Sequence, residues 1–478
     1  MKKKIIVIGA GAAGLMAAIS AARSGAEVTI LEAQDRPGRK LLVTGNGRCN
    51  LTNTDKNICE RYHGTGAALA EQLLKQFSVM DTLAFFWELG LLTKEKNEYV
   101  YPYSSQASSV LEVLLAELRR LRVKLKFSVT ITEIIDYGKC PGHSQKQPGV
   151  SAEAGDESAF AFGSSELSGQ LMRYAVVTPT WTYTADAVIL ACGSKAAPSA
   201  GASGKGYALA QALGHSIIHP RPALVPFTCQ APFPEQKLAG VRCRAEVSLL
   251  RRDCNRIELV ARDTGELQWT RYGVSGIVIF QLSRFVQFPG DHKNLSSQRN
   301  GVTNTQTNGK TDSASGGCKQ NSYLLRIDFL PDYTEVEIEE LLLKRAEDLG
   351  RESVSVLLRG LLNEKLIPVI LKRSGEACGG DLPESCSEIA DHKDFIYTLV
   401  AVMKGYLLPV TGTKSFDQAQ VCAGGVDCRE ISDRLESRLH EYLYFAGELL
   451  DVDGPCGGYN LQWAWTSGYL AGKNATEI

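Results

Sequence analysis

Apolar residues near the start of the chain fall in short runs separated by glycine, which predicts a strand, a helix and a second strand. Residues 5–8 form an apolar run of β-branched residues bounded by glycine, as is typical of a buried parallel strand. Residues 12–24 are rich in Ala, Leu and Met, which favour helix, and Gly25 stands where such a helix would end. Residues 28–31 form the second apolar run. The pattern therefore predicts a βαβ unit over residues 4–32.

The next segment predicts helices followed by strands. Apolar side chains recur at helical spacing in residues 66–90 and 104–121. Residues 122–135 alternate apolar and basic positions, as a half-buried strand does, and we interpret the basic side chains as its solvated face. Residues 171–190 predict further strands.

The middle of the chain has a different pattern of apolar and polar residues from both ends. One helical region, about 334–372, accompanies short runs typical of strands at residues 224–225, 241–250, 257–261, 277–282 and 323–329. After residue 411, strand and helix patterns punctuated by glycine return. We therefore expect one domain formed by residues 1–200 and 411–478, with a second domain, residues 201–410, inserted into it.

Three polar, low-complexity stretches interrupt these patterns. Few branched apolar residues occur in residues 137–169, 289–321 and 374–392. We interpret all three as loop insertions with few chemically suggestive residues.

Composition excludes several classes of protein. Among 478 residues, 52 Lys and Arg balance 53 Asp and Glu, which argues against nucleic acid or an anionic membrane as the main partner. No apolar run approaches the ~18 residues of a membrane-spanning helix. Glycines and charges enter the N-terminal apolar stretch too early for a signal peptide, so a cytoplasmic protein is expected. The 13 cysteines include no C-x-x-C pair, which leaves no sign of a zinc or dithiol site.

The glycines between the first strand and helix form a dinucleotide-binding fingerprint. In the run Gly9, Ala10, Gly11, Ala12, Ala13, Gly14, the first glycine makes the turn, the second admits a pyrophosphate and the third lets helix and strand pack closely. The helix N-terminus offers free N–H groups to the phosphates. Glu32 ends the second strand, where its carboxylate can accept hydrogen bonds from ribose hydroxyls and would repel a 2′-phosphate. The fingerprint does not choose between FAD and NAD.

A long loop after Glu32 favours a flavin dinucleotide. Residues 38–53 are dense in glycine, amides and cations, so the loop can lay N–H groups along an extended cofactor while Arg39 or Lys40 meets phosphate. An NAD-binding fold rarely needs a second phosphate loop directly after the ribose carboxylate. The alternative is a surface loop with an incidental Gly-Asn-Gly turn.

The C-terminal segment also contains a glycine-rich loop that precedes a helix. Residues 442–448 are interpreted as a strand, and the glycine-rich loop after it precedes a helix at residues 461–470. That helix N-terminus would stabilise negative charge on a reduced flavin ring. Asp451 and Asp453 have no histidine at ligand spacing, so they are expected to bond a ribityl chain or a backbone turn and not a metal. The alternative is a packed terminal helix with two core tryptophans.

These motifs together resemble the BaiN/YhiN-like bacterial flavoproteins, a family that includes an aminoacetone oxidase and a 3-dehydro-bile acid reductase. The resemblance rests on Gly9–Gly14 with Glu32, and on residues 44–53, 204–207, 421–426 and 447–465. It implies FAD and an α/β fold, with a Rossmann-like FAD-binding domain formed by both chain ends and an inserted β-barrel plus helical domain. The positions assigned to FAD are Gly9, Ala10, Gly11, Ala12, Ala13, Gly14, Glu32, Arg39, Lys40, Thr44, Gly45, Asn46, Gly47, Cys49, Asn50, Val129, Gly447, Glu448, Asp453, Gly457, Gly458 and Asn460.

The chain departs from this family in two places. Many relatives carry His and Pro where this chain has residues 270–277, so any role of that histidine is absent or has moved. Cys192 stands where Thr is common, which puts a hydroxyl contact in doubt.

Three functions remain open on the sequence. The first is an NAD(P)H-linked flavin reductase of a conjugated enone, for which the resemblance points to 3-oxo bile acids. The second is a flavin oxidase of a small amine such as aminoacetone, and the third a flavoprotein that binds tRNA, which the balanced charge disfavours. Tyr207 and Tyr272 are candidates for a proton donor. Residues of these types, and histidines such as His215 and His219, more often have structural roles. We expect a small-molecule substrate, no metal, NAD(P)H only as a transient co-substrate, and no nucleic-acid or membrane partner.

Overall fold

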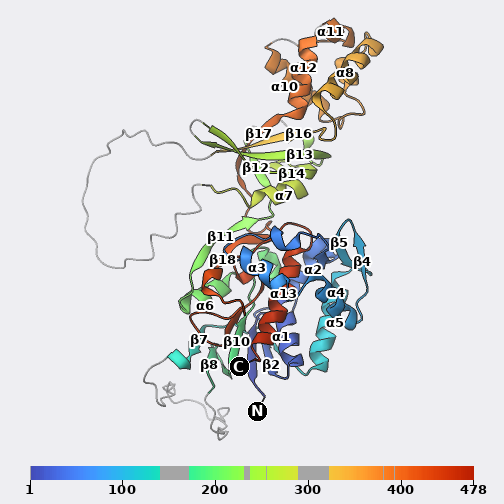
Figure 1. Ribbon diagram of the computed structural model, residues 1–478. Helices are drawn as coiled ribbons and strands as arrows, with labels where there is room; N and C mark the ends of the chain where they lie inside the picture. Colours follow the sequence, from blue (N-terminus) through green and yellow to red (C-terminus); the bar gives the residue numbers. More distant parts are fainter. Residues whose placement is uncertain are drawn as a thin grey trace, which may run out of the picture. The chain divides into compact units, whose positions relative to one another are not determined.

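The chain folds into two compact units, each described by itself below. The computed structural model describes residues 2–139, 172–230, 237–253, 256–288, 322–379, 382–391 and 393–477. The first unit comprises Met1–Pro220 and Gly424–Ile478, and the second comprises Arg221–Ala423. In Figure 1, the blue N-terminal and red C-terminal segments lie together in the first unit.

A parallel five-stranded sheet forms the centre of the first unit. Its order is β19-β10-β1-β2-β6, and each neighbouring pair is parallel. The strands are β1 (Lys4–Ile8), β2 (Glu27–Leu31), β6 (Lys124–Lys126), β10 (Ala187–Leu190) and β19 (Leu443–Phe445). Ile5–Ile8 is buried throughout, because helices and strands cover both faces of β1. The Rossmann-like α/β fold expected from the sequence is confirmed.

Two helices from opposite ends of the chain pack side by side in this unit. They are α1 (Ala12–Arg23) and α13 (Tyr459–Asn474). A Cβ on Gly468 would stand 2.4 Å from the carbonyl oxygen of Ala13, and one on Gly472 would stand 2.2 Å from that of Ala17. The two helices therefore run parallel, with their backbones in direct contact.

Smaller elements complete the first unit. Two antiparallel sheets are β3-β5-β4 (Thr52–Asn53, Tyr99–Pro102, Thr93–Lys96) and β7-β8-β9 (Glu133–Asp136, Tyr174–Val177, Thr182–Ala185). The remaining helices are α2 (Arg39–Val43), α3 (Ala67–Leu74), α4 (Val79–Glu88), α5 (Ala107–Arg120) and α6 (Lys205–Ala212). The strands in which the chain leaves and re-enters this unit, β11 (Ile217–Ala223) and β18 (Val421–Val426), pair with each other.

The second unit combines a closed β-barrel with a group of helices. The barrel order is β12-β15-β14-β13-β16-β17, with strands Phe227–Cys229, Gly273–Ser275, Arg256–Trp269, Arg242–Asp253, Ser322–Asp328 and Tyr406–Thr413. The helices are α7 (Ile277–Ser283), α8 (Glu335–Leu349), α9 (Val354–Leu357), α10 (Ile367–Cys378), α11 (Cys386–Asp391) and α12 (Lys393–Lys404). One apolar core of barrel and helix side chains joins the two parts.

The structure corrects several local expectations. Residues 277–282, expected as a strand, form α7, because Val278, Ile279 and Leu282 share one buried helical face. The stretch 374–392 is not a loop, since α10 ends in it and α11 lies within it. Residues 224–225 lie between β11 and β12 in no strand. The expected loop insertions at 137–169 and 289–321 lie almost entirely outside the described residues.

The domain boundaries also differ from the expected ones. Residues 201–220 lie in the first unit, because α6 buries Tyr207 and Ala210 in its core. Residues 411–423 lie in the second unit, because β17 continues to Thr413 as a barrel strand.

A buried carboxylate on α5 makes the stability of the first unit depend on pH. The hydrogen bond from Arg120 and, against the opposing effect of burial, that from Arg23 lower the pKa of Glu117 to about 2. Because the folded pKa lies below the ordinary value of 4.5, this stabilisation is present above pH 4.5 and is lost as pH falls toward 2.

Glu117→Gln is therefore expected to lower the free energy of unfolding by about 2 kcal/mol near neutral pH, because two guanidinium groups lose their buried partner. The difference from wild type should shrink below pH 4.5, which urea unfolding at a series of pH values would measure. Glu112→Gln, at an exposed position of the same helix, is the control. A difference that stays constant down to the lowest pH at which the protein folds would contradict this assignment.

Candidate functional site

The loop between β1 and α1 leaves an open place at its middle glycine. A Cβ on Gly9 would stand 2.4 Å from the Ala191 carbonyl oxygen, and one on Gly14 would stand 1.9 Å from that of Gly9. A Cβ on Gly11 would meet no atom within 4 Å, and Gly11 is the N-cap of α1. The outer glycines therefore permit close packing, whereas Gly11 leaves room for a ligand at the helix N-terminus.

Glu32 lies beside this loop at the end of β2. Its carboxylate accepts hydrogen bonds from the N–H of Ala10 at 2.6 Å and from the N–H of Gln34 at 2.8 Å. The N–H of Val129 donates to the carbonyl of Glu32 at 2.9 Å. The structure thus brings together three positions assigned from the sequence: the glycine loop, Glu32 and Val129.

Lys40 meets a carboxylate from the other end of the chain. Its Nζ lies 2.6 Å from Glu448 Oε2, and the hydroxyl of Ser194 donates to the same oxygen at 3.0 Å. Ser194 follows β10 and is anchored by the N–H of Ala196. Sequence reasoning assigned Lys40 and Glu448 but missed Ser194, whose only signal is its place just after the strand beside β1.

Arg39 is used differently from its neighbour. Its guanidinium donates to the side chain of Gln34 at 2.7 Å and to the carbonyl of Ser199 at 3.2 Å. These contacts hold the turn at residues 198–200 against the segment after β2. Arg39 therefore binds the segment after β2 and the turn at residues 198–200. Lys40 instead pairs with Glu448, which precedes the C-terminal glycine loop.

The loop of residues 44–50 has an unusual backbone. Positive φ values occur at Gly45, Asn46, Gly47 and Cys49, and the Thr44 hydroxyl donates to the carbonyl of Leu41. Non-glycine residues in this conformation are uncommon and concentrate at functional sites. Burial raises the pKa of the Cys49 thiol to about 12, so this cysteine is a protonated structural residue and not a nucleophile.

Asn50 ends this loop with a buried polar atom that the protein leaves unsatisfied. Its side-chain oxygen is buried and has no hydrogen-bond partner among the described residues. A buried amide oxygen without a partner costs free energy unless a ligand or water supplies a donor. Asn50 therefore points to a ligand that carries an N–H or O–H group.

The acidic residues before α13 are structural. Asp451 accepts hydrogen bonds from the N–H of Thr65 at 2.7 Å and of Gly424 at 2.9 Å, so it braces backbone turns. Asp453 is buried and pairs through its backbone with His63. Asn460 was assigned to the cofactor from the sequence. Its side-chain amide instead donates to the carbonyls of Gly454 and Pro455 and accepts from the N–H of Gly454, which stabilises the glycine loop.

Gly457 and Gly458 let this loop approach other parts of the unit closely. A Cβ on Gly457 would overlap the ring of Tyr99, and one on Gly458 would stand 2.5 Å from the Thr52 backbone. Gly447 likewise approaches Ala13 on α1, and its N–H bonds the Ser467 hydroxyl of α13. The C-terminal loop is thereby held against β3 and β5, and Gly447 is held against α1.

The N-termini of α1 and α13 are offset along a common direction. Gly468 lies beside Ala13, so α13 begins eight residues, or about 12 Å, before α1 does. Two sets of free N–H groups therefore lie one behind the other. This spacing, the open place at Gly11 and the unsatisfied Asn50 oxygen fit an extended dinucleotide such as FAD.

The two tyrosines considered as proton donors lie in different units. Tyr207 is buried in α6, within the core of the first unit. Tyr272 lies next to β15 of the barrel, where the Lys414 Nζ stands 3.8 Å from its ring centroid and its hydroxyl lies 3.4 Å from Gln418 Oε1. Neither position assigns a catalytic role.

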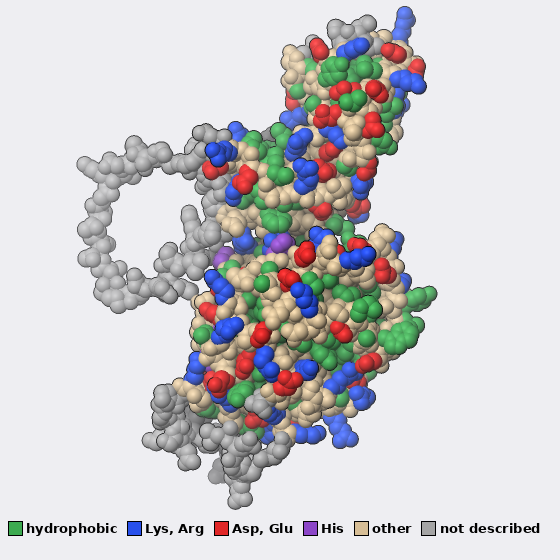
Figure 2. Space-filling model, viewed as in Figure 1, with side chains coloured by type: hydrophobic (Ala, Val, Ile, Leu, Met, Phe, Trp, Pro, Cys, Tyr) green, Lys and Arg blue, Asp and Glu red, His purple; other side chains and the backbone are tan. Residues whose placement is uncertain are grey.

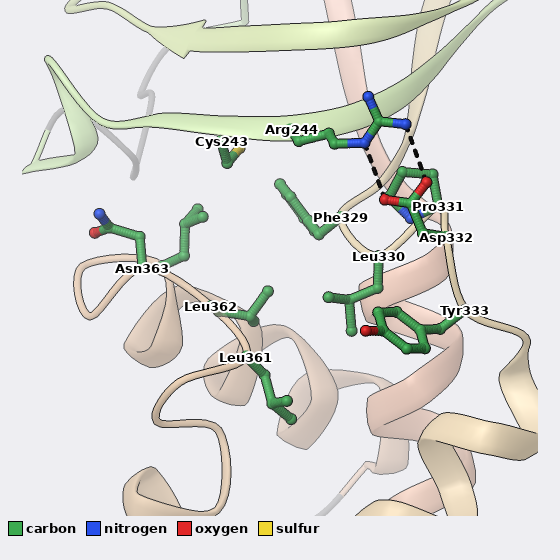
Figure 3. Close-up of a pocket in the computed structure, with 11 residues that line it drawn as sticks. Cys243, Arg244, Phe329, Leu330, Pro331, Asp332, Tyr333, Leu361, Leu362 and Asn363 are labelled. Carbon is green, nitrogen blue, oxygen red and sulfur yellow. Dashed lines mark hydrogen bonds and ion pairs between the residues drawn. The ribbon is translucent and has the colours of Figure 1, made fainter.

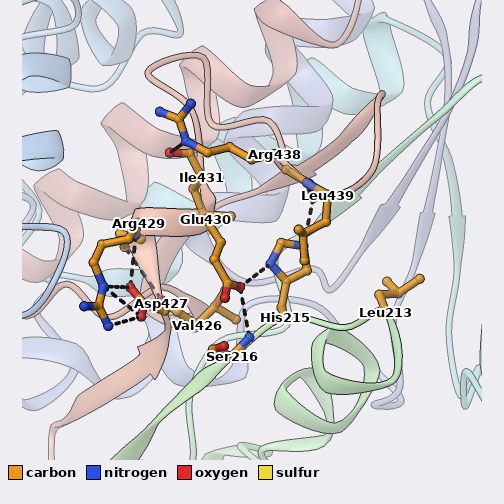
Figure 4. Close-up of polar contacts among 12 residues, drawn as sticks. Leu213, His215, Ser216, Val426, Asp427, Arg429, Glu430, Ile431, Arg438 and Leu439 are labelled. Atoms are coloured by element: carbon orange, nitrogen blue, oxygen red, sulfur yellow. Dashed lines mark hydrogen bonds and ion pairs between the residues drawn. The ribbon is translucent and has the colours of Figure 1, made fainter.

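His215 is a structural residue. Its Nε2 lies 2.8 Å from the Ser437 hydroxyl, whose oxygen already accepts the N–H groups of Leu439 and His440, so this hydroxyl donates to the ring. The Nδ1–H then donates to Glu430 at 3.1 Å (Figure 4). Burial, which outweighs the nearby Glu430, lowers the pKa of His215. A neutral His215 thus fastens the segment around residues 430–440.

The second unit holds a cavity of about 230 Å³ between β13 and the helices. Its wall is mostly apolar and includes Phe329, Leu330 and Leu362 (Figure 3). At its edge Arg244 binds Asp332 through two hydrogen bonds of 2.9 and 3.0 Å. The cavity therefore lies within the second unit, and the cation at its edge is already paired.

The described residues contain neither a group of metal-binding side chains nor a helix able to span a membrane. Among the described residues, no three His, Cys, Asp or Glu side chains are grouped so as to hold a metal ion. None of the helices in the described ranges has the length and apolarity needed to cross a membrane.

Comparison with known proteins gives consistent matches. A family model described as the HI0933-like protein Rossmann domain matches residues 3–474. The chain is 40% identical to the 3-dehydro-bile acid delta(4,6)-reductase of Clostridium scindens, over 99% of both chains. It is 26% identical to the ribosomal RNA dihydrouridine synthase of Escherichia coli, over 98% of this chain and 97% of that one. A 3-ketosteroid-Δ4-(5α)-dehydrogenase from Rhodococcus jostii RHA1 superposes with a TM-score of 0.43 and 16% identity, covering 100% of this chain and 97% of that one.

Proposed function

The chain belongs to the HI0933-like family, a Rossmann-domain family of FAD-dependent oxidoreductases, and from this premise we propose that it reduces a carbon–carbon double bond conjugated to a carbonyl group. The proposed substrate is a 3-oxo bile acid, and the proposed electron donor is NADH or NADPH. The proposed FAD contacts are those expected from the sequence, except that Arg39, Cys49, Asp453 and Asn460 shape the surrounding loops. Ser194 is added through its hydrogen bond to Glu448.

The names of the relatives support this bond type. The relative at 40% identity is named as a delta(4,6)-reductase of a 3-dehydro-bile acid, and the relative at 26% as a dihydrouridine synthase. Dihydrouridine differs from uridine by two hydrogens added across a double bond that is conjugated to a carbonyl. Both names therefore describe addition of hydrogen to an activated double bond, which favours reduction over oxidation of an amine.

The observation that carries the proposal is the offset pair of parallel helices α1 and α13. When bound, FAD would supply hydride transfer from NAD(P)H to the carbon β to the carbonyl, and a proton from solvent would be added at the α carbon. The N–H groups at the start of α1 would bind the pyrophosphate, and Glu32 would accept ribose hydroxyls. The N-terminus of α13 would hold negative charge on the reduced ring.

A small-molecule substrate remains part of the proposal. On the face shown in Figure 2, Lys and Arg side chains are interspersed with Asp and Glu. Such a surface lacks the single-sign field that draws nucleic acid. Because the E. coli relative is named for ribosomal RNA, RNA is included as an arm of the test.

The test is anaerobic reduction followed by addition of substrate. NADH or NADPH should bleach the flavin of the purified protein, and a 3-oxo-4-ene bile acid should restore its colour with a product heavier by two hydrogens. A saturated 3-oxo bile acid, with no double bond to reduce, is the control. Flavin that is reoxidised only by unmodified ribosomal RNA, or that is reduced by aminoacetone and not by NAD(P)H, would overturn the proposal.

A further inference from the structure

Two tyrosines of β5 lie beside two loops proposed to bind FAD, the loop of residues 44–50 and the loop before α13. In β5 the side chains of Val100 and Pro102 are buried, whereas those of Tyr99 and Tyr101 are partly exposed on the opposite face. The Tyr99 ring packs against Gly457, and the Tyr101 ring lies 3.7 Å from the place of a Cβ on Gly45. We call these two rings the tyrosine shelf.

The shelf is held firmly in this position. β5 pairs with β3, which places Tyr99 opposite Asn53. The amide of Asn53 donates to the carbonyl of Gly457 at 2.9 Å, so the strand pair is tied to the loop before α13. The shelf therefore keeps a constant relation to the glycines on either side of it.

A cation stands at one end of the shelf. The guanidinium carbon of Arg48 lies 5.4 Å from the centroid of the Tyr101 ring, and its Nε donates to the carbonyl of Gly45 at 3.2 Å. Arg48 is exposed, and within the described ranges no carboxylate pairs with it. The ring and the carbonyl orient the guanidinium, while its remaining N–H groups can still bind an anion.

We propose that the tyrosine shelf and Arg48 form the substrate-recognition surface, which selects a flat apolar molecule that carries a carboxylate. The inference rests on the proposed function, because a substrate of the flavin must lie against the ring and hence beside the loops of Gly45 and Gly457. Aromatic rings bind the flat faces of an apolar polycycle, and arginine binds carboxylate through paired hydrogen bonds. A bile acid has both features, a fused apolar ring system and a carboxylate side chain.

The test measures equilibrium binding to the FAD-loaded protein with a ligand that cannot be reduced. Saturated 3-oxocholanoic acid and its methyl ester share the ring system but differ in charge. Wild type is expected to bind the acid about 10-fold more tightly than the ester in calorimetry. Arg48→Gln should reduce this preference to about twofold or less, and Arg48→Lys should retain part of it because the charge remains.

The shelf variants should act on both ligands alike. Tyr101→Ala is expected to weaken the acid and the ester by about 10-fold each, whereas Tyr101→Phe should bind as wild type does, because the ring face is retained. Lys94 of β4 and Tyr103, which follows β5, provide a matched cation–ring pair, since the Lys94 Nζ lies 5.6 Å from the Tyr103 ring centroid. Lys94→Gln and Tyr103→Ala should keep the wild-type affinities.

The outcomes separate this inference from the proposed function. If wild type reduces the enone but binds acid and ester equally, or if Arg48→Gln keeps the preference, the recognition surface is wrong and the function stands. If the enone is not reduced yet acid binding depends on Arg48, the function is wrong and the surface stands. The FAD content of each variant, measured by absorbance, shows whether the loop of residues 44–50 is intact.

Discussion

A Gly11→Asp variant is expected to fold as the wild type does and to purify without FAD. Gly11 has φ −80° and ψ −174°, a conformation open to any residue, and a Cβ there would meet no atom within 4 Å. Asp is also a favourable N-cap, so α1 should gain stability. The new carboxylate would occupy the place proposed for the pyrophosphate and repel its charge, which should weaken FAD binding about 100-fold or more.

The measurement is the ratio of flavin to protein after purification, followed by titration of the apoprotein with FAD. Thermal unfolding of the apoprotein should give the wild-type transition or a higher one. Ser24→Asp adds the same charge at the other end of α1 and should keep its flavin. Stoichiometric FAD in Gly11→Asp would refute the placement of the pyrophosphate at α1.

A Gly468→Ala variant is expected to lose about 3 kcal/mol of stability. Its methyl group would stand 2.4 Å from the backbone oxygen of Ala13, so α1 and α13 would have to separate. The higher helix propensity of alanine, about 1 kcal/mol, opposes the loss without cancelling it. Because the offset of the two helices sets the proposed cofactor site, FAD affinity should fall together with stability.

Urea unfolding of the apoprotein isolates the packing effect from the contribution of bound FAD. Gly11→Ala is the matched control, since it makes the same substitution at the start of the partner helix where no atom is near. Wild-type stability in Gly468→Ala would show that the two backbones are not in the contact described.

The local signals at the start of the chain were sufficient to predict its first elements. Apolar runs and glycines predicted β1, α1 and β2 within a residue or two, because a buried parallel strand and a glycine turn each require particular residue types. The positions of Gly9, Gly14 and Glu32 follow from the same local requirements, and the structure gives each a distinct contact.

Short apolar runs in the middle of the chain were ambiguous. Residues 277–282 satisfy both a buried strand and a buried helix, and only packing against β14 decides for the helix. Helix α11 was hidden in a polar stretch because two buried side chains, Cys386 and Ile389, are enough to anchor it in the core.

By itself, the sequence determined the fold class, the fingerprint for a dinucleotide and the two glycine loops, because these depend on residues that are neighbours along the chain. Only the tertiary structure decided that Gly468 and Gly472 set the contact between α1 and α13. It also decided that Ser194 and Lys40 both bind Glu448, and that the Arg48 guanidinium lies over the Tyr101 ring. Each of these pairs residues from different elements, most of them far apart in the chain, and no periodicity or spacing can encode such a distance. Close backbone approach and shared hydrogen-bond partners exist only once the elements have packed.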